Sequence, residues 1–326
     1  MNTSEDISGN DVAFFKNYIP MQPSAIAKAT VTIALYIVTN IMNGMLIFTY
    51  FKHPIFYENS RYVLFVHLVI NDVFELSVAL TLHIWSEVKP FIFVPVCYFY
   101  LILAVNTTLN TPLNLAVMCL ERYIAICYPL RHSQICSLQR TYIAIGVIWF
   151  IGFIPPITDL FIVLAVEQTS FFSTSIYCLR ENFFRVSYQY DKRVFIKTLY
   201  FSVVWLVIVC TYLRIMFAAR SASSSEKTSA KKARNTILLH GLQLLLAMLT
   251  FIAPFTENFF WSFPSGMLLD LHYVRYFLVY IIPRTLSPVI YGLRDENFRK
   301  HLKGHLPCFQ NPVAPSKAAG NHSSGK

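Results

Sequence analysis

Residues 94–131, VPVCYFYLILAVNTTLNTPLNLAVMCLERYIAICYPLR, decide the fold of this chain. The first part, 94–120, is an uncharged and mostly apolar run that exceeds the roughly 20 residues an α-helix needs to cross a bilayer. The run is polar for such a helix, because asparagine and threonine recur between positions 106 and 114. A membrane helix this polar is expected at the centre of a bundle, where its neighbours shield it from lipid.

Six other runs of comparable length flank this one, at about 26–50, 61–84, 141–165, 195–218, 236–261 and 271–292. Hydrophobic residues make up 55% of the chain and charged residues 13%, against about 25% charged residues in soluble domains. So few charges cannot cover a water-facing surface. Strands of a membrane barrel are excluded, because the runs are too long and do not alternate. The sequence therefore predicts an all-α membrane protein, a bundle of seven transmembrane helices.

The distribution of lysine and arginine predicts the orientation of the bundle. If the N-terminus is outside, 17 of the 27 basic residues lie in the cytoplasmic pieces, about 51–61, 121–140, 212–235 and 293–326, and six lie in extracellular pieces. Cytoplasmic loops of membrane proteins carry this excess. We therefore expect the N-terminus outside and the C-terminus in the cytoplasm, and we attribute the net charge of +10 to topology rather than to nucleic-acid binding.

The chain then divides into an extracellular N-terminus (1–25), the seven-helix domain (26–292), a short amphipathic helix on the membrane surface (293–304) and a disordered cytoplasmic tail (305–326). Residues 1–24 contain no cleavable signal, so the first helix should insert itself. Asn2, in Asn2-Thr3-Ser4, is an expected glycosylation acceptor. Cys308 lies just beyond the amphipathic helix, where palmitoylation and a free thiol are equally reasonable.

Two of the seven cysteines, Cys97 and Cys178, fall in extracellular positions. Thiols on an oxidising face usually pair, and two free thiols are the alternative. A disulfide closing so long a loop would contribute roughly 4–5 kcal/mol in the chain-entropy model. It would also hold the second outer loop over the mouth of the bundle.

The segment from Met118 to Arg131, with Glu121-Arg122-Tyr123 at its centre, resembles the segment that marks olfactory receptors within the rhodopsin-like class of G-protein-coupled receptors. Arg122 is a cation at the boundary of membrane and cytosol, able to pair with Glu121 in one conformation and to leave it in another. An arginine that merely anchors a helix end would explain one residue but not the whole run.

Further segments resemble the same family in the expected order, so the resemblance covers about residues 40–300. They are Asn43-Gly44, His53-Pro54 with Tyr57, Leu68 to Asp72, Lys232 to Thr236 with His240, and Pro283 with Leu286 to Tyr291. The sequence from Lys231 to Leu246 resembles fish olfactory receptors more than mammalian ones. Three features depart from the family: Ser287 replaces its usual asparagine, the second outer loop has a single cysteine, and Arg284 is an unexpected cation in span seven.

Arg284 motivates a hypothesis about the middle of the membrane. An isolated charge at this depth is costly, so a partner is expected. In receptors of this class the acid at the position of Asp72 lies near span seven and can hold a sodium ion. We expect Asp72 and Arg284, with Asn43 nearby, to form an internal polar network in which the arginine replaces sodium. Glu75 is a competing partner, and a water-filled cavity is the alternative.

The resemblance also implies a ligand pocket in the outer half of the bundle. A small, largely apolar ligand with one polar group would suit its walls, and helix packing is the alternative role for each residue. Glu257 could meet that polar group, pair with Arg275 or face water. The residues implied are Ala104, Val105, Thr108, Ser202, Glu257, Phe277 and Tyr280.

At the cytoplasmic face, the resemblance implies a heterotrimeric G protein as partner, of the stimulatory olfactory type. Glu121, Arg122, Tyr123, Tyr212 and Tyr291 would form the switch that opens toward it. We expect a multi-pass protein of the plasma membrane, in the cilia of olfactory neurons, with membrane lipid and a small-molecule odorant as its other partners. The alternatives are a non-olfactory receptor of the same class, for a lipid-like or hormone ligand, and a transporter or channel.

An enzyme is not expected, because the cytoplasmic loops are too short for a catalytic domain. The histidines lack metal-ligand spacing, so neither a metal nor a cofactor is predicted.

Overall fold

The computed structural model describes residues 23–88, 91–221, 273–274, 277–286, 298 and 300–301. Five long helices make up most of this part: α2 (Pro23–Lys52), α4 (Ser60–Val88), α5 (Val94–Cys127), α7 (Leu138–Val166) and α8 (Ser187–Ser221). All five are long and apolar enough to cross a membrane. They coincide with the first five predicted spans and extend beyond them at most ends.

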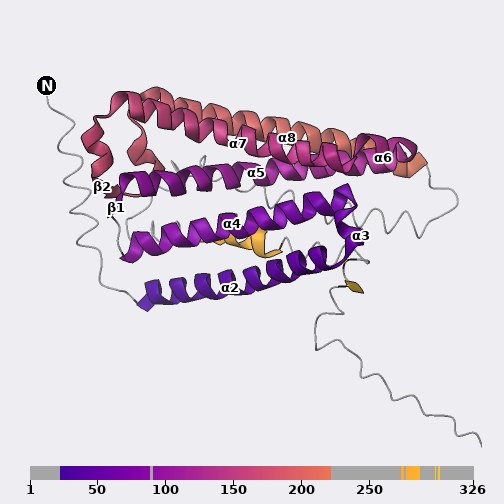
Figure 1. Cartoon of the computed structure of the whole chain (residues 1–326), viewed down its shortest axis with the longest axis horizontal. Coiled ribbons are helices and arrows are strands. Elements are labelled where there is room, and N and C mark those ends of the chain that lie inside the picture. The colour runs from indigo at the N-terminus through magenta and orange to yellow at the C-terminus, as the bar shows by residue number, and fades with distance from the viewer. Residues whose placement is uncertain are drawn as a thin grey trace, which may run out of the picture.

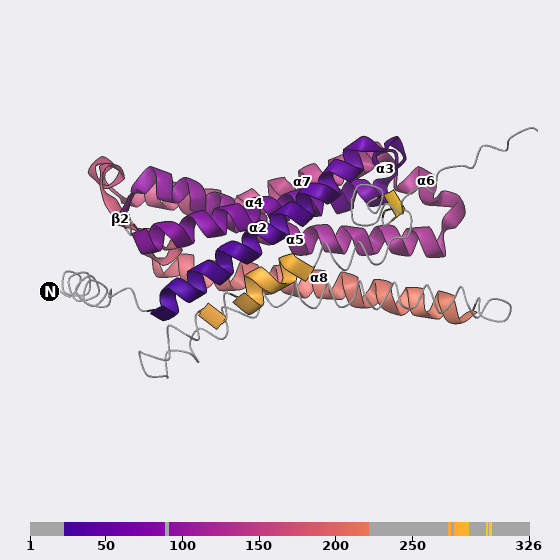
Figure 2. The same ribbon diagram turned by 90° about the horizontal axis from the view of Figure 1, so that it is seen from below.

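Several predictions fall outside the described residues. Span six (236–261) and the predicted tail (305–326) lie there completely, as do residues 1–22 and most of the predicted amphipathic helix. Residues 23–25, predicted to belong to the N-terminal segment, form the start of α2. Span seven (271–292) is described mainly by residues 277–286, which begin with the π-helical turn η4 (Phe277–Ile281). This segment lies beside α2 (Figures 1 and 2).

Helix α5 is the central helix of the described bundle. It packs against α4, α7 and α8, whereas α2 packs on α4. Its polar side chains are buried at Asn106, Thr107, Asn110, Thr111 and Asn114. The prediction that the most polar span is shielded by its neighbours is therefore confirmed.

The outer faces of the surrounding helices are apolar. Large side chains such as Phe150 and Phe161 on α7 and Phe195 and Leu206 on α8 are mostly exposed. Water would not favour so much exposed apolar surface on a single soluble domain. Lipid contact accounts for it.

Pro155 in α7 shows how the bundle satisfies a backbone group without water. Pro155 has no N–H, so it leaves the carbonyl of Ile151 without its helical partner. The hydroxyl of Tyr200 on α8 donates to that carbonyl at 3.1 Å. A side chain from a neighbouring helix is the expected replacement in a membrane. This contact fixes α8 against α7.

Short elements close the two ends of the bundle (Figure 1). At one end β1 (Phe91–Phe93) pairs with β2 (Ser175–Tyr177) in antiparallel register. The 3-10 turns η2 (Thr169–Ser173) and η3 (Arg180–Phe183) flank β2. At the other end lie α3 (Pro54–Tyr57), η1 (Pro129–Arg131) and α6 (His132–Ile135).

An aromatic cluster holds the second end together. Phe56 of α3 and Phe298 are both fully buried, with ring centroids 4.9 Å apart. Phe65 of α4 adds an edge-to-face contact with Phe298 at 5.7 Å. Phe298 is thus packed against both α3 and α4.

Candidate functional site

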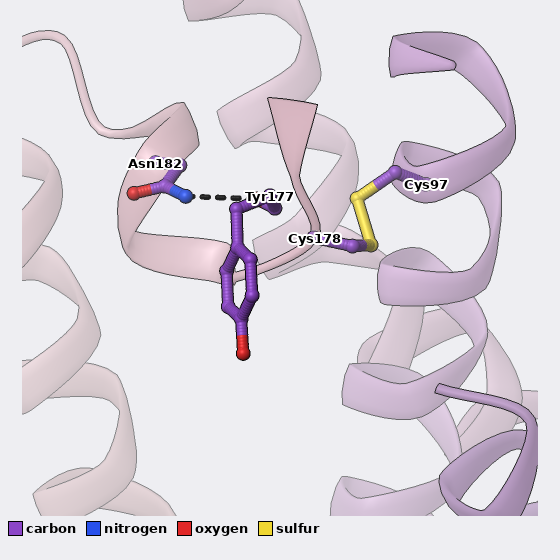
Figure 3. The surroundings of a disulfide bond; sticks show 4 residues. All are labelled: Cys97, Tyr177, Cys178 and Asn182. Atoms are coloured by element: carbon purple, nitrogen blue, oxygen red, sulfur yellow. Dashed lines mark hydrogen bonds between the residues drawn. A yellow bond between two sulfur atoms is a disulfide. The ribbon is translucent and has the colours of Figure 1, made fainter. Parts of the chain in front are cut away.

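A disulfide between Cys97 and Cys178 closes the end of the bundle that the sequence predicts to be the outer one (Figure 3). This is the pairing predicted from the sequence. Cys97 lies in the first turn of α5 and is fully buried, and Cys178 directly follows β2. The amide of Asn182 donates to the carbonyl of Tyr177 at 2.7 Å and shapes the turn after the disulfide. The second outer loop is therefore held on the start of α5.

Below this loop a buried acid, Asp159 of α7, joins three parts of the chain. Its Oδ2 accepts from Arg180 of the loop at 2.9 Å, and its Oδ1 accepts from Lys192 of α8. Lys192 also donates to the hydroxyl of Thr158 at 3.0 Å. Sequence reasoning missed this cluster. The available signal was that Asp159 is the one charged residue between positions 141 and 165.

A small pocket lies between this cluster and α5. Its walls are mostly apolar, and Asp159 and Arg180 are the charged residues among them. The lining consists of Tyr98, Leu101, Ile102, Val105, Pro156, Asp159, Arg180, Phe183 and Phe184.

Of the residues predicted to contact a ligand, Val105 lines this pocket. Ala104 is half-buried one residue away, and Ser202 on α8 is exposed. Phe277 stacks on Tyr273, with centroids 6.2 Å apart. Glu257 and the side chain of Tyr280 lie outside the described part of the chain.

Thr108, also predicted as a ligand contact, belongs to a polar centre deeper in the bundle. Its hydroxyl donates to Oε1 of Glu75 on α4 at 3.2 Å, and Thr111 donates to Oε2 at 3.3 Å. Arg284 of the span-seven segment donates from Nη2 to Oε1 of the same carboxylate at 2.7 Å. These buried groups connect α4, α5 and span seven.

Both acids weighed as partners of Arg284 lie beside it, and the predicted Asp72–Arg284 pair is the longer of the two contacts. Oδ1 of Asp72 lies 4.0 Å from Nε of Arg284, whereas the Glu75 contact is 2.7 Å. Glu75 lies one turn nearer the disulfide end of the bundle, has a longer side chain and accepts hydrogen bonds from two threonine hydroxyls. The competing partner is thus the main one, and Asp72 is a second acid beside the same guanidinium.

Asn43, the remaining member of the predicted network, is completely buried on α2. Among the described residues its side-chain amide has no hydrogen-bond partner. Other contacts join α2 to span seven. The hydroxyl of Thr39 lies 3.0 Å from that of Thr285, and the hydroxyl of Tyr273 donates to the carbonyl of Lys28 at 3.2 Å.

The inner end of α5 carries a second acid with two partners. Oε2 of Glu121 lies 3.4 Å from Nε of Arg122, and Oε1 lies 3.0 Å from Nε2 of His132 in α6. Glu121 is buried, whereas Arg122 and His132 are partly exposed. Sequence reasoning missed His132, because nothing in the pattern shows that α6 folds back on α5.

The other predicted switch residues, where they are described, make aromatic or apolar contacts. Tyr123 packs edge-to-face on Tyr128 at 5.8 Å. Tyr212 of α8 packs on the main apolar core. Tyr291 lies outside the described residues, as do Asn2 and Cys308.

Comparisons with known proteins agree with this architecture. Residues 42–291 match the 7 transmembrane receptor (rhodopsin family). The chain is 32% identical to Odorant receptor 131-2 from Danio rerio over 287 residues, 88% of this chain and 86% of that protein. It is 27% identical to Olfactory receptor 10P1 from Homo sapiens over 208 residues, 61% of this chain and 63% of that protein.

Rhodopsin from Petromyzon marinus is 22% identical over 297 residues, which are 86% of this chain and 81% of that protein. These relatives are receptors and not enzymes. The family match spans most of the chain, and the similarity to an odorant receptor spans nearly all of it. The chain therefore belongs to the rhodopsin family of seven-transmembrane, G-protein-coupled receptors.

Proposed function

We propose that this receptor is an odorant receptor of the plasma membrane. It binds a small, largely apolar molecule in the outer half of the bundle and activates a heterotrimeric G protein, of the stimulatory olfactory type, at its cytoplasmic face. The similarity to an odorant receptor over 88% of the chain supports the ligand class.

The arrangement of Arg122 carries the proposal for signalling. Its guanidinium lies at the inner end of the central helix, beside the buried carboxylate of Glu121. An arginine that is paired but partly exposed can exchange its partner when the bundle changes shape. Ligand would favour the conformation in which span six moves outward, as a shift in population between two states. Arg122, Tyr212 and Tyr291 would then line the cavity that receives the G protein.

The proposal fixes the orientation of the chain. The Cys97–Cys178 disulfide belongs on the oxidising side of the membrane, so the Arg122 end of α5 faces the cytosol. Residues 1–25, with the glycan acceptor Asn2, are then outside. Residues 293–326, with the surface helix and Cys308, are inside, and delivery to olfactory cilia follows from the same function.

Cells expressing the full chain provide the test. A panel of water-soluble odorants should raise cyclic AMP, and Arg122→Ala should abolish the response at unchanged surface amount. Arg131→Ala, in the neighbouring 3-10 turn, is the matched control and should respond normally. Odorant-evoked ion currents without cyclic AMP would instead favour a channel and overturn the proposal.

A further inference from the structure

The acid at the Arg122 end of α5 is shared between a residue of its own helix and a residue of the short helix α6. Oε2 of Glu121 lies 3.4 Å from Nε of Arg122, and Oε1 lies 3.0 Å from Nε2 of His132. The carboxylate is buried, whereas the side chains of Arg122 and His132 are 21% and 27% exposed. One negative charge therefore serves two partners, and the charge on His132 affects how firmly it holds Arg122.

The fold of the connecting segment brings His132 to this acid. The turn η1 leads from the end of α5 into α6, where the N–H of Cys136 donates to the carbonyl of His132 at 2.8 Å. Arg140 of α7 fixes the far end of α6, because its guanidinium donates to the carbonyl of Gln134 at 2.9 Å. The imidazole is thus held against Glu121 by a segment that is fixed at both ends.

The other groups around His132, within the described part of the chain, leave the imidazole as the one that changes charge most readily near neutral pH. Three arginines near the segment stay cationic throughout this range, and they are Arg122, Arg131 and Arg140. Burial and the negative charge of Glu121 raise the pKa of the Cys136 thiol, against the opposing effect of Arg140, so the thiol stays neutral. Histidine, in contrast, gains or loses its proton between about pH 5 and pH 8.

A proton on His132 weakens the hold of Glu121 on Arg122 in two ways. The imidazolium is a second cation on the same carboxylate, and its charge-assisted hydrogen bond draws the shared charge away from Arg122. It also repels the guanidinium, because like charges this close oppose each other. Arg122 is held loosely to begin with, since 3.4 Å exceeds the usual length of a charge-assisted hydrogen bond. Among the described residues, its Nη2 is buried without a hydrogen-bond partner.

We propose that His132 is a positioning residue of the switch, and that its protonation shifts the receptor toward the signalling conformation. An acidic cytosol then raises ligand-free signalling, and an alkaline cytosol lowers it. The populations change because the proton binds better in the state in which Arg122 has left Glu121 to His132 alone. The inference rests on the proposed G-protein coupling and adds a second input to it, from the cytosolic side.

Signalling and conformation are measured separately on the full-length receptor without ligand. Signalling is followed by cyclic AMP in cells whose cytosolic pH is clamped between about pH 6 and pH 8, relative to cells without the receptor. Conformation is followed in the purified receptor, without G protein, by the distance between spin labels at the inner ends of α5 and the predicted span six. Both readouts should rise on acidification, cyclic AMP by about two- to fivefold, as expected for a contact between partly exposed charges.

Three variants identify the residue. His132→Gln keeps a side chain that can donate a hydrogen bond but carries no charge, and it should abolish the dependence on pH. His132→Arg carries a permanent cation and should signal at the acid level at every pH. His53→Gln is the matched control and should respond like the wild type, because this histidine packs on His301 at the same end of the bundle, with ring centroids 4.6 Å apart.

Each outcome decides between the two proposals. A label distance that does not change with pH in the wild-type receptor overturns the inference without any variant and leaves the odorant function standing. The same slope in His132→Gln also overturns it, because another group, such as Glu121 itself, would then bind the proton. A fall in either readout on acidification contradicts it, since the charged imidazole would then hold the switch closed. A label distance that follows pH without any receptor-dependent cyclic AMP supports the inference and contradicts the proposed signalling.

Discussion

Replacing Arg284 tests the polar centre of the bundle, where one guanidinium faces two carboxylates. Arg284 and Glu75 are buried, with side chains 2% and 5% exposed and an N–O distance of 2.7 Å. At an effective dielectric constant of about 20, unit charges at this distance attract by about 6 kcal/mol, and at the 4.0 Å of Asp72 by about 4 kcal/mol. Glu75 should therefore be the stronger partner.

The net effect on stability is smaller than these attractions, because burying the charges is itself costly. Removing one member of a buried pair typically costs about 3–5 kcal/mol. We expect the loss of stability in Arg284→Met to lie at the upper end of this range, since the substitution leaves two acids without their cation. Glu75→Gln should cost less, because Arg284 keeps Asp72, and Asp72→Asn should cost least of the three.

Thermal unfolding of the purified receptor and its surface amount in cells measure this order. The double variant Glu75→Gln/Arg284→Met should be less destabilised than the sum of its single variants by about 1–3 kcal/mol, because contacting residues are not additive. Wild-type stability in Arg284→Met would refute the ion pair. A larger loss in Asp72→Asn than in Glu75→Gln would show that Asp72 is the principal partner after all.

Three further sets of substitutions test the helix packing, the Glu121–Arg122 pair and the disulfide. Gly152→Ala should destabilise the bundle by about 1–3 kcal/mol, because its Cβ would lie 2.7 Å from Oδ1 of Asn110, whereas Gly146→Ala meets no atom within 4 Å and should be harmless in the same unfolding assay. Glu121→Gln should raise ligand-free cyclic AMP by releasing Arg122, and an unchanged basal level would contradict that role. Cys97→Ser, Cys178→Ser and the double variant should lose surface staining equally, since each removes one disulfide worth roughly 4–5 kcal/mol; unequal losses would argue against the pairing.

The five described membrane helices were predictable because hydrophobic length is a property of the sequence alone. The central place of α5 was predictable for a related reason. Its asparagine and threonine side chains need partners that lipid cannot provide. The disulfide followed from topology, since it requires only that Cys97 and Cys178 share the oxidising side.

The partners of individual side chains were less predictable. Helix α8 is apolar on nearly every face, so periodicity did not show that Ser202 points outward. Asp72 and Glu75 differ by one turn, and the choice between them depends on side-chain length and on the positions of Thr108 and Thr111. The Asp159–Arg180 and Glu121–His132 contacts each join a long helix to a connecting segment whose fold the sequence pattern does not specify.

Helix α5 contacts buried acids at three depths of the bundle. Near the outside, Tyr98 packs beside the Asp159 cluster. In the middle, Thr108 and Thr111 donate hydrogen bonds to Glu75. At the inner end the acid is Glu121, which belongs to α5 itself. Each acid shares its carboxylate between groups from different elements, and buried charges of this kind are costly unless paired. A movement of α7 relative to the outer loop would break the contact between Asp159 and Arg180. Because these clusters all rest on one helix, such a change can reach Glu121 through a shift of α5 or its neighbours as rigid bodies, without a continuous chain of hydrogen bonds.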